Sequence, residues 1–167
     1  MHLLHPIWAE IDLNNLINNI EEIKKKSNKS EIIGVVKANA YGHGAVEVSK
    51  TLLSFGVKKL AVANIVEAIE LRENNIDAPI MLLGISEDYA INQLIDYNVE
   101  PTVSTLHFAK NLNEAARKKN KTINIHIALD SGMGRIGFKN TSKDIEDIVL
   151  ISNLSNLKID SIFSHFS

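Results

Sequence analysis

Lys37 is the side chain whose position in this sequence best suits nucleophilic chemistry. It ends the apolar segment at residues 31–37 and precedes a turn that contains Gly42 and Gly44. A lysine at the end of a buried strand loses hydration, which favours the neutral amine that attacks an aldehyde to form a Schiff base. The same position also suits a lysine whose charged end simply extends to solvent.

Arg135 lies in a second segment that is suited to binding a ligand. The sequence LDSGMGRIGF at residues 129–138 follows an apolar run and places this arginine among glycines. Glycines let a ligand approach the backbone closely, and the fixed charge of an arginine suits a phenolate or a carboxylate. Taken alone, the segment also describes a surface arginine after a flexible turn.

His165 follows the last apolar run, at residues 158–163, and is paired with Phe166. A histidine at a strand end can pack against the ring of a ligand or be an ordinary core residue. The six histidines are scattered without the spacing of metal ligands, so we interpret His43 as a polar turn residue and expect no metal site. Because the chain has no cysteine, disulfides and thiolate nucleophiles are excluded.

Short apolar runs rich in Val and Ile alternate with longer amphipathic segments along the chain. The runs predict strands at residues 31–37, 59–63, 79–83, 99–103, 122–130 and 158–163. The segments between them predict helices near residues 44–55, 65–74, 87–97, 105–119 and 142–153, after a first helix capped by Asp12. A further apolar run at residues 7–13 could be an extra strand that pairs outside the main sheet.

Strands that are apolar throughout indicate a parallel sheet covered on both faces, so the chain is predicted to be α/β. A doubly wound open sheet and a (β/α)8 barrel both satisfy this alternation, and periodicity does not distinguish them. In either fold, ligands bind at the C-terminal ends of the strands. Lys37, Arg135 and His165 all follow predicted strands.

The segment VVKANAYGHG, which contains Lys37, resembles the pyridoxal-phosphate attachment segment of alanine racemases. This resemblance implies that Lys37 binds the cofactor covalently and is one of two catalytic bases, and that Tyr41 contacts the cofactor phosphate. The segment DSGMGR is similar to a family loop whose arginine contacts the phenolic oxygen of the cofactor, which implies a cofactor-binding and catalytic role for Arg135. His165 matches the histidine that packs on the pyridine ring.

Ala128 departs from the family pattern. Many members have a lysine at this position, often carbamylated, whose added carboxylate orients the arginine. An alanine cannot do this, so we expect a bound anion, a water or another side chain to hold Arg135. Disorder of Arg135 with cofactor bound would contradict that expectation.

The resemblance covers residues 8–165 and implies a (β/α)8 barrel, with residues 1–167 as the N-terminal part of the cofactor-binding barrel domain. Such a barrel needs about 250 residues and eight strands, whereas this chain supplies about six of them. We therefore expect an incomplete barrel from a longer enzyme. The family's C-terminal β-domain, which gives the second base, a tyrosine, across a homodimer interface, is expected to be absent, and the chain alone to be inactive.

The implied activity is the interconversion of L-alanine and D-alanine, which supplies D-alanine for cell-wall peptidoglycan. The main alternative among enzymes is racemisation of another small amino acid such as serine. A fold-related decarboxylase is a second one, but the alanine-racemase form of the lysine segment argues against it. A non-catalytic barrel that binds pyridoxal phosphate and a folding module without cofactor are alternatives of other classes.

Charge and hydropathy restrict the partners. The 18 basic and 20 acidic residues give a net charge of -2, which favours neither nucleic acid nor a membrane surface. The N-terminus lacks the pattern of a secretory signal, and no stretch approaches membrane-spanning length. We therefore expect a cytoplasmic protein whose partner is a small molecule.

Overall fold

Six parallel strands form one curved sheet in the computed structural model, which describes residues 7–28 and 30–167. The strands are β1 (Ile33–Val35), β2 (Lys59–Val62), β3 (Ile80–Ile85), β4 (Glu100–Val103), β5 (Ile123–Leu129) and β6 (Leu157–Ser164). Each corresponds to one predicted strand, with ends that differ by at most two residues. The six strand predictions are therefore confirmed.

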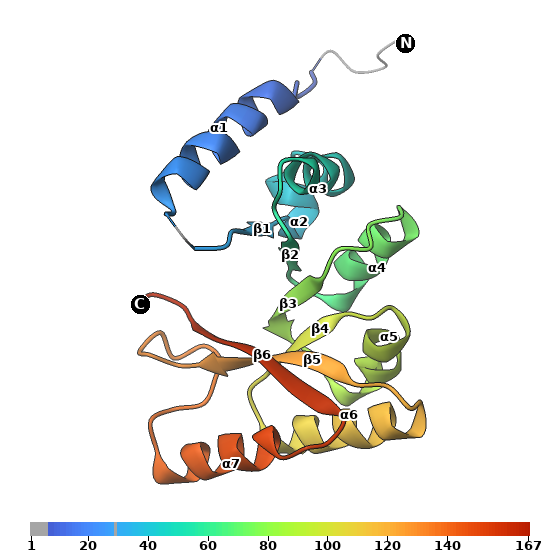
Figure 1. The fold of residues 1–167 in the computed structure, drawn as a ribbon, viewed down its shortest axis with the longest axis vertical. Helices are drawn as coiled ribbons and strands as arrows, with labels where there is room; N and C mark the ends of the chain where they lie inside the picture. Colours follow the sequence, from blue (N-terminus) through green and yellow to red (C-terminus); the bar gives the residue numbers. More distant parts are fainter. Residues whose placement is uncertain (1–6, 29) are drawn as a thin grey trace.

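Helices α3 to α7 follow one another around the convex side of this sheet (Figure 1). They are α3 (Ala45–Ser54), α4 (Ile65–Glu73), α5 (Ile91–Asp96), α6 (Leu106–Lys118) and α7 (Ser142–Ser152), with a short 3-10 turn, η1 (Asp88–Ala90), before α5. The first helix, α1 (Leu13–Lys26), packs against α3. The short element α2 (Lys37–Tyr41) was not predicted as a helix.

The strand order decides between the two folds that the sequence left open. Neighbours in the sheet are neighbours in the chain, from β1 through to β6. A doubly wound sheet reverses its strand order at a switch point, whereas a (β/α)8 barrel adds each strand beside the last one. The sheet is therefore an incomplete barrel, with β1 and β6 at its two edges.

Polar side chains set the starting points of several helices. Asp12, the predicted cap of the first helix, accepts a hydrogen bond from the backbone N–H of Asn14 at 2.8 Å. Asn64, Thr105 and Thr141 cap α4, α6 and α7 in the same way. Each satisfies a backbone N–H that would otherwise lack a partner in the first helical turn.

The core lies between the sheet and the helices on its convex side. Its centre is formed by fully buried aliphatic side chains of strands and helices, including Leu60, Leu71, Leu82, Leu94, Leu112 and Ile127. The opposite, concave side is less covered. On β1, the side chains of Ile33 and Val35 are 42% and 40% exposed. In a closed barrel, this side is filled by the side chains of the other strands.

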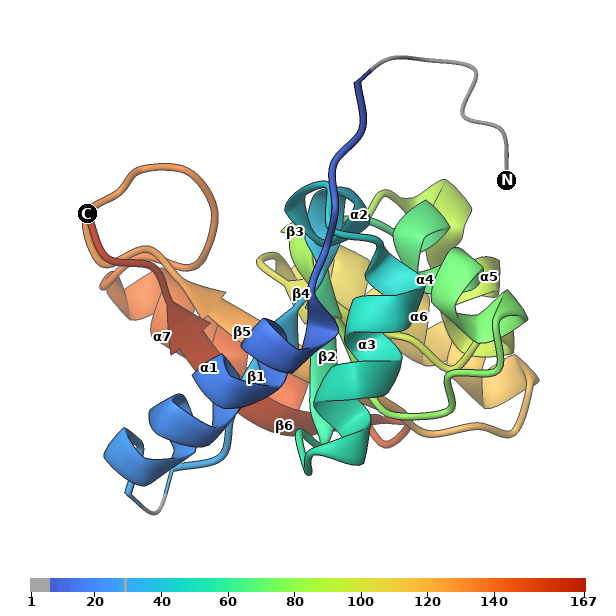
Figure 2. The same ribbon diagram turned by 90° about the horizontal axis from the view of Figure 1, so that it is seen from above.

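The apolar run at residues 7–13 does not form a strand. Residues 7–12 have neither helical nor strand structure, and Leu13 opens α1. Figure 2 shows this segment extending away from the sheet, where it has no strand to pair with. Within the described ranges, none of the helices combines the length and the apolar character that crossing a membrane requires.

Candidate active site

The turn that follows β1 has a left-handed backbone. Ala38, Asn39, Ala40 and Tyr41 have φ angles between 51° and 56°. This region costs about 1–2 kcal/mol for a residue with a Cβ atom, and runs of it are rare. The segment with the strongest chemical signal in the sequence is therefore also strained, and contacts around it must hold it in this conformation.

Hydrogen bonds close the turn and lead it into α3. The N–H of Gly42 donates to the carbonyls of Ala38 and Asn39, both at 3.1 Å, and the N–H of Gly44 donates to the Asn39 carbonyl at 3.0 Å. The Asn39 side chain accepts from the N–H of Ala45, the first residue of α3, at 2.7 Å. Gly42 and Gly44 have φ of 89° and 92°, so both glycines of the motif are needed for backbone reasons.

Lys37 and Tyr41 leave their polar groups available. Lys37 is partly buried and Tyr41 is 61% exposed. Within residues 7–28 and 30–167, neither side chain forms an ion pair or a side-chain hydrogen bond, although backbone groups around them do. A cavity of about 450 Å³ between α1 and α3 is lined by Tyr41 but not by Lys37, so the amine lies outside it.

The loop after β5 is shaped by the carboxylate of Asp130. This carboxylate accepts hydrogen bonds from the N–H groups of Gly132 at 3.0 Å and Gly134 at 2.9 Å, and they lower the pKa of Asp130. The ends of the loop are joined where the N–H of Asp130 donates to the Phe138 carbonyl at 2.8 Å. Arg135 lies at the exposed part of this closed loop.

Arg135 and His165 lie close together, and Figure 2 shows the loop after β5 beside the end of β6. The Ser131 hydroxyl is 3.3 Å from both the Ser164 hydroxyl and the His165 carbonyl, and a small cavity is lined by both Arg135 and His165. Ala128 is buried, and among the described residues no side chain is hydrogen-bonded to Arg135. That a bound anion, a water or another side chain holds Arg135 stays a prediction.

The sheet divides the four predicted site residues into two pairs. Lys37 and Tyr41 follow β1, at one edge, while Arg135 and His165 follow β5 and β6, at the other. All four lie at the C-terminal ends of their strands, as expected for the functional end of a barrel. Closing the barrel between β6 and β1 is what would bring the pairs to one site.

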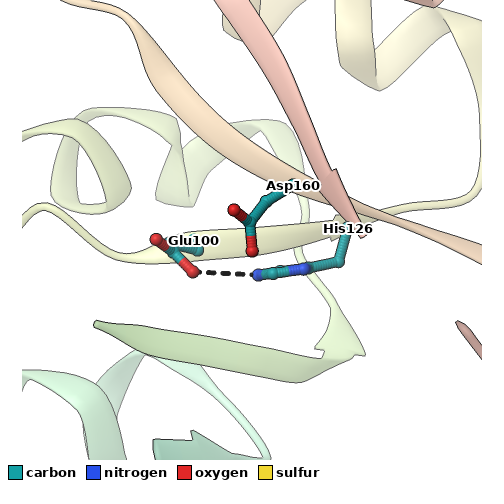
Figure 3. A group of neighbouring side chains, drawn as sticks. All are labelled: Glu100, His126 and Asp160. Atoms are coloured by element: carbon teal, nitrogen blue, oxygen red, sulfur yellow. Dashed lines mark hydrogen bonds and ion pairs between the residues drawn. The ribbon is translucent and has the colours of Figure 1, made fainter. Parts of the chain in front are cut away.

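A second polar centre, which we call the lower network, lies nearer the N-terminal ends of the strands. The Lys59 ammonium is 2.6 Å from the carboxylates of both Glu100 and Asp160. His126 is 3.0 Å from Glu100 through Nε2 (Figure 3) and 2.7 Å from the Ser161 hydroxyl through Nδ1. Glu100, His126 and Asp160 are close enough to bind a cation, but the Lys59 ammonium already bridges the two carboxylates.

Hydrogen bonding dominates the electrostatics of the lower network. Burial alone would raise the pKa of Glu100, but hydrogen bonds from His126, Lys59 and Asn124 outweigh it and lower the pKa to about 2. Burial acts to lower the pKa of Lys59, and its bonds to Asp160 and Glu100 reverse this and raise it. The network is thus a charged, internally paired structure.

The sequence indicated neither the lower network nor the role of Glu67, whose carboxylate binds the turn after β1. One weak signal for the network was available, because His126 interrupts the otherwise apolar run INIHIAL. For Glu67, the spacing from Asn64 suggests a helix start. Its contact to Ala38, 29 residues away, cannot be read from spacing.

Comparisons with known proteins agree with the incomplete barrel fold. Residues 11–167 match the family described as alanine racemase, N-terminal domain. Alanine racemase 1 of Clostridium acetobutylicum is 52% identical over 98% of this chain, which corresponds to 42% of that protein. The chain thus spans about two fifths of the length of the curated relatives it matches.

Two solved structures extend the comparison. The alanine racemase of Clostridium difficile 630 in complex with cycloserine superposes with a TM-score of 0.96 at 40% identity, covering 99% of this chain and 46% of that one. The histidine racemase of Leuconostoc mesenteroides superposes with a TM-score of 0.86 at 26% identity, covering 94% of this chain and 42% of that one. Proteins with two different named substrates therefore share this arrangement of strands and helices.

Proposed function

Because this chain belongs to the alanine racemase family, through its N-terminal domain, we propose that it forms part of an enzyme that interconverts L-alanine and D-alanine with pyridoxal phosphate. The observation that carries this proposal is the left-handed turn after β1, which sets Lys37 at a strand end with Tyr41 exposed beside it. The product D-alanine would serve cell-wall synthesis.

The residues present fit pyridoxal phosphate. Lys37 offers an amine without an ion-pair partner in the described chain, and the Tyr41 hydroxyl can donate to a phosphate oxygen. Beside them, a Cβ atom built on Gly42 or Gly44 would meet nothing within 4 Å, so the backbone here is open to a ligand. Arg135 provides a fixed positive charge for the phenolic oxygen, and the His165 ring a flat surface for the pyridine.

When bound, pyridoxal phosphate supplies an electron sink that stabilises the charge left when an α-proton departs. Lys37 would hold the cofactor, and its Nζ would take or return the α-proton on one face of the substrate. Racemisation needs a second base on the opposite face. We place that base outside these 167 residues, on a C-terminal β-domain of the partner subunit in a cytoplasmic homodimer, with residues 1–167 as the N-terminal part of the barrel domain.

A second candidate is a racemase for another amino acid. The similarity to a histidine racemase favours keeping it, because that protein shares the fold and its name gives a different substrate. An alternative of a different class is a non-catalytic protein that binds pyridoxal phosphate.

The test is α-proton exchange in D2O. The full-length protein with pyridoxal phosphate should replace the α-proton of L-alanine by deuterium and produce D-alanine, whereas the 167-residue chain alone should give negligible turnover. Faster exchange with serine or histidine would favour the second candidate. Covalent cofactor binding without any exchange would contradict the racemase proposal and support the non-catalytic one.

A further inference from the structure

We propose that Glu67 is a positioning residue that holds the left-handed turn and so fixes the places of Lys37 and Tyr41. The inference rests on the proposed function, because it assigns Glu67 a role in presenting those two residues to the cofactor. Glu67 is in the first turn of α4, on the neighbouring βα unit, and its carboxylate is hydrogen-bonded to backbone N–H groups rather than to the side chain of Lys37 or Tyr41.

The contact that carries this inference joins two elements. Glu67 Oε1 accepts a hydrogen bond from the N–H of Ala38 at 2.9 Å, and Oε2 accepts one from the N–H of Ala63 at 2.7 Å. Ala38 directly follows Lys37 and is the first residue of the left-handed run. One carboxylate thus ties the start of the strained turn to the end of β2.

The support for this carboxylate extends one strand further. The Ala63 carbonyl accepts from the N–H of Gly84 at 3.2 Å, and a Cβ atom on Gly84 would lie 2.4 Å from that oxygen. The N–H of Glu67 is itself bound to the Asn64 side chain at 3.1 Å. The C-terminal ends of β1, β2 and β3 are therefore linked through Glu67 and Ala63.

Glu67 is the acceptor for the N–H of Ala38, the first amide of the left-handed run. Several later amides of the segment bond to carbonyls inside it, for example Ala40 to the Val36 carbonyl at 2.9 Å. The N–H of Ala38 donates to Glu67 instead, and Ala38 is exposed. Without the carboxylate, this amide would bond to water, and the first left-handed residue would lose its only side-chain anchor in the described chain.

The chemistry of the side chain predicts a graded response to substitution. A carboxylate accepts hydrogen bonds at both oxygens, whereas the amide of E67Q keeps one acceptor and turns an N–H₂ group toward the other donor. E67A removes both acceptors. Glu70, one turn later on α4 and exposed, offers a matched control as E70Q.

The experiment compares hydrogen exchange in the full-length protein and its variants, without cofactor. Exchange at residues 37–45 should accelerate about tenfold or more in E67A, since the lost bonds involve a charged acceptor. E67Q should fall between E67A and wild type, and E70Q should match wild type. Exchange in β5 should stay unchanged in all of them.

A second readout concerns Lys37 itself. The rate at which Lys37 captures pyridoxal phosphate, measured by borohydride trapping and mass mapping, should fall about tenfold in E67A and less in E67Q. Wild-type exchange at residues 37–45 in E67A, or equal acceleration in β5, would overturn the inference. If wild-type protein captures no cofactor at Lys37, the proposed function fails, while the exchange data still decide whether Glu67 holds the turn.

Discussion

Polar residues have opposite surroundings in the lower network, nearer the N-terminal ends of the strands, and at the C-terminal ends. In the lower network, Lys59, Glu100 and His126 are satisfied by one another in regular strands. At the C-terminal ends, Lys37 and Arg135 have no side-chain partner among the described residues, and Lys37 opens a strained turn. The paired groups therefore stabilise the barrel, while the unpaired groups at the other end are available for a ligand.

The largest effect is expected for K37R, which retains the charge but binds an aldehyde poorly. We expect complete loss of the visible absorbance that pyridoxal phosphate shows when it is bound to lysine, with unchanged thermal unfolding. K50R, on the exposed side of α3, is the control and should bind like wild type. Retained absorbance in K37R would place the cofactor elsewhere.

The second-largest effect is expected on stability, when a charge is removed from the lower network. E100Q should lower the free energy of unfolding by about 3–5 kcal/mol, as for removal of one partner from a buried ion pair. E114Q, which removes an exposed pair with Arg117, should change it by less than about 1 kcal/mol. Urea unfolding of both variants measures the difference. Equal effects would mean that the lower network contributes no more than a surface pair.

The pH dependence of stability should report the same network. The pKa of Glu100 is about 2 in the folded protein and 4.5 ordinarily, so the unfolded state binds its proton more readily. Its stabilisation is present above pH 4.5 and is lost as the pH falls toward 2, on the order of 3 kcal/mol in total. Acid titration of unfolding should therefore be shallower in E100Q than in wild type over this range, and identical slopes would contradict the assignment.

The smallest effect is expected for Y41F. If the Tyr41 hydroxyl donates to the cofactor phosphate, its removal should weaken binding roughly tenfold or more, as for a hydrogen bond to a charged group. Y89F is the control, because the Tyr89 side chain is 81% exposed and lies in η1, after β3 rather than after β1. Cofactor titration followed by absorbance gives both affinities. Unchanged affinity in Y41F would remove this residue from the site.

Periodicity and strand-end motifs predicted much of this molecule. The apolar runs gave all six strands, and Asp12 marked the first helix, because both signals are local. Periodicity did not distinguish a barrel from a doubly wound sheet, since that depends on the order in which strands pair. Resemblance of the segment around Lys37 to a known family pointed to the barrel, and the observed order agrees with it.

The missed features include one unusual backbone conformation and two contacts between residues far apart in the chain. The left-handed turn could not be inferred from alanines, which ordinarily favour right-handed helix, and only Gly42 and Gly44 hinted at it. Glu67 reaches Ala38 across 29 positions. Pairing of His126 with Glu100 requires the register between β4 and β5, which no single strand reveals.

The most direct test of the central claim is to map where pyridoxal phosphate binds. Full-length protein would be incubated with the cofactor, reduced with borohydride, digested and analysed by mass spectrometry. We predict one modified residue, Lys37, with the peptide around it carrying the added mass in wild type and none in K37R. Modification spread over other lysines, or none at Lys37, would contradict the account.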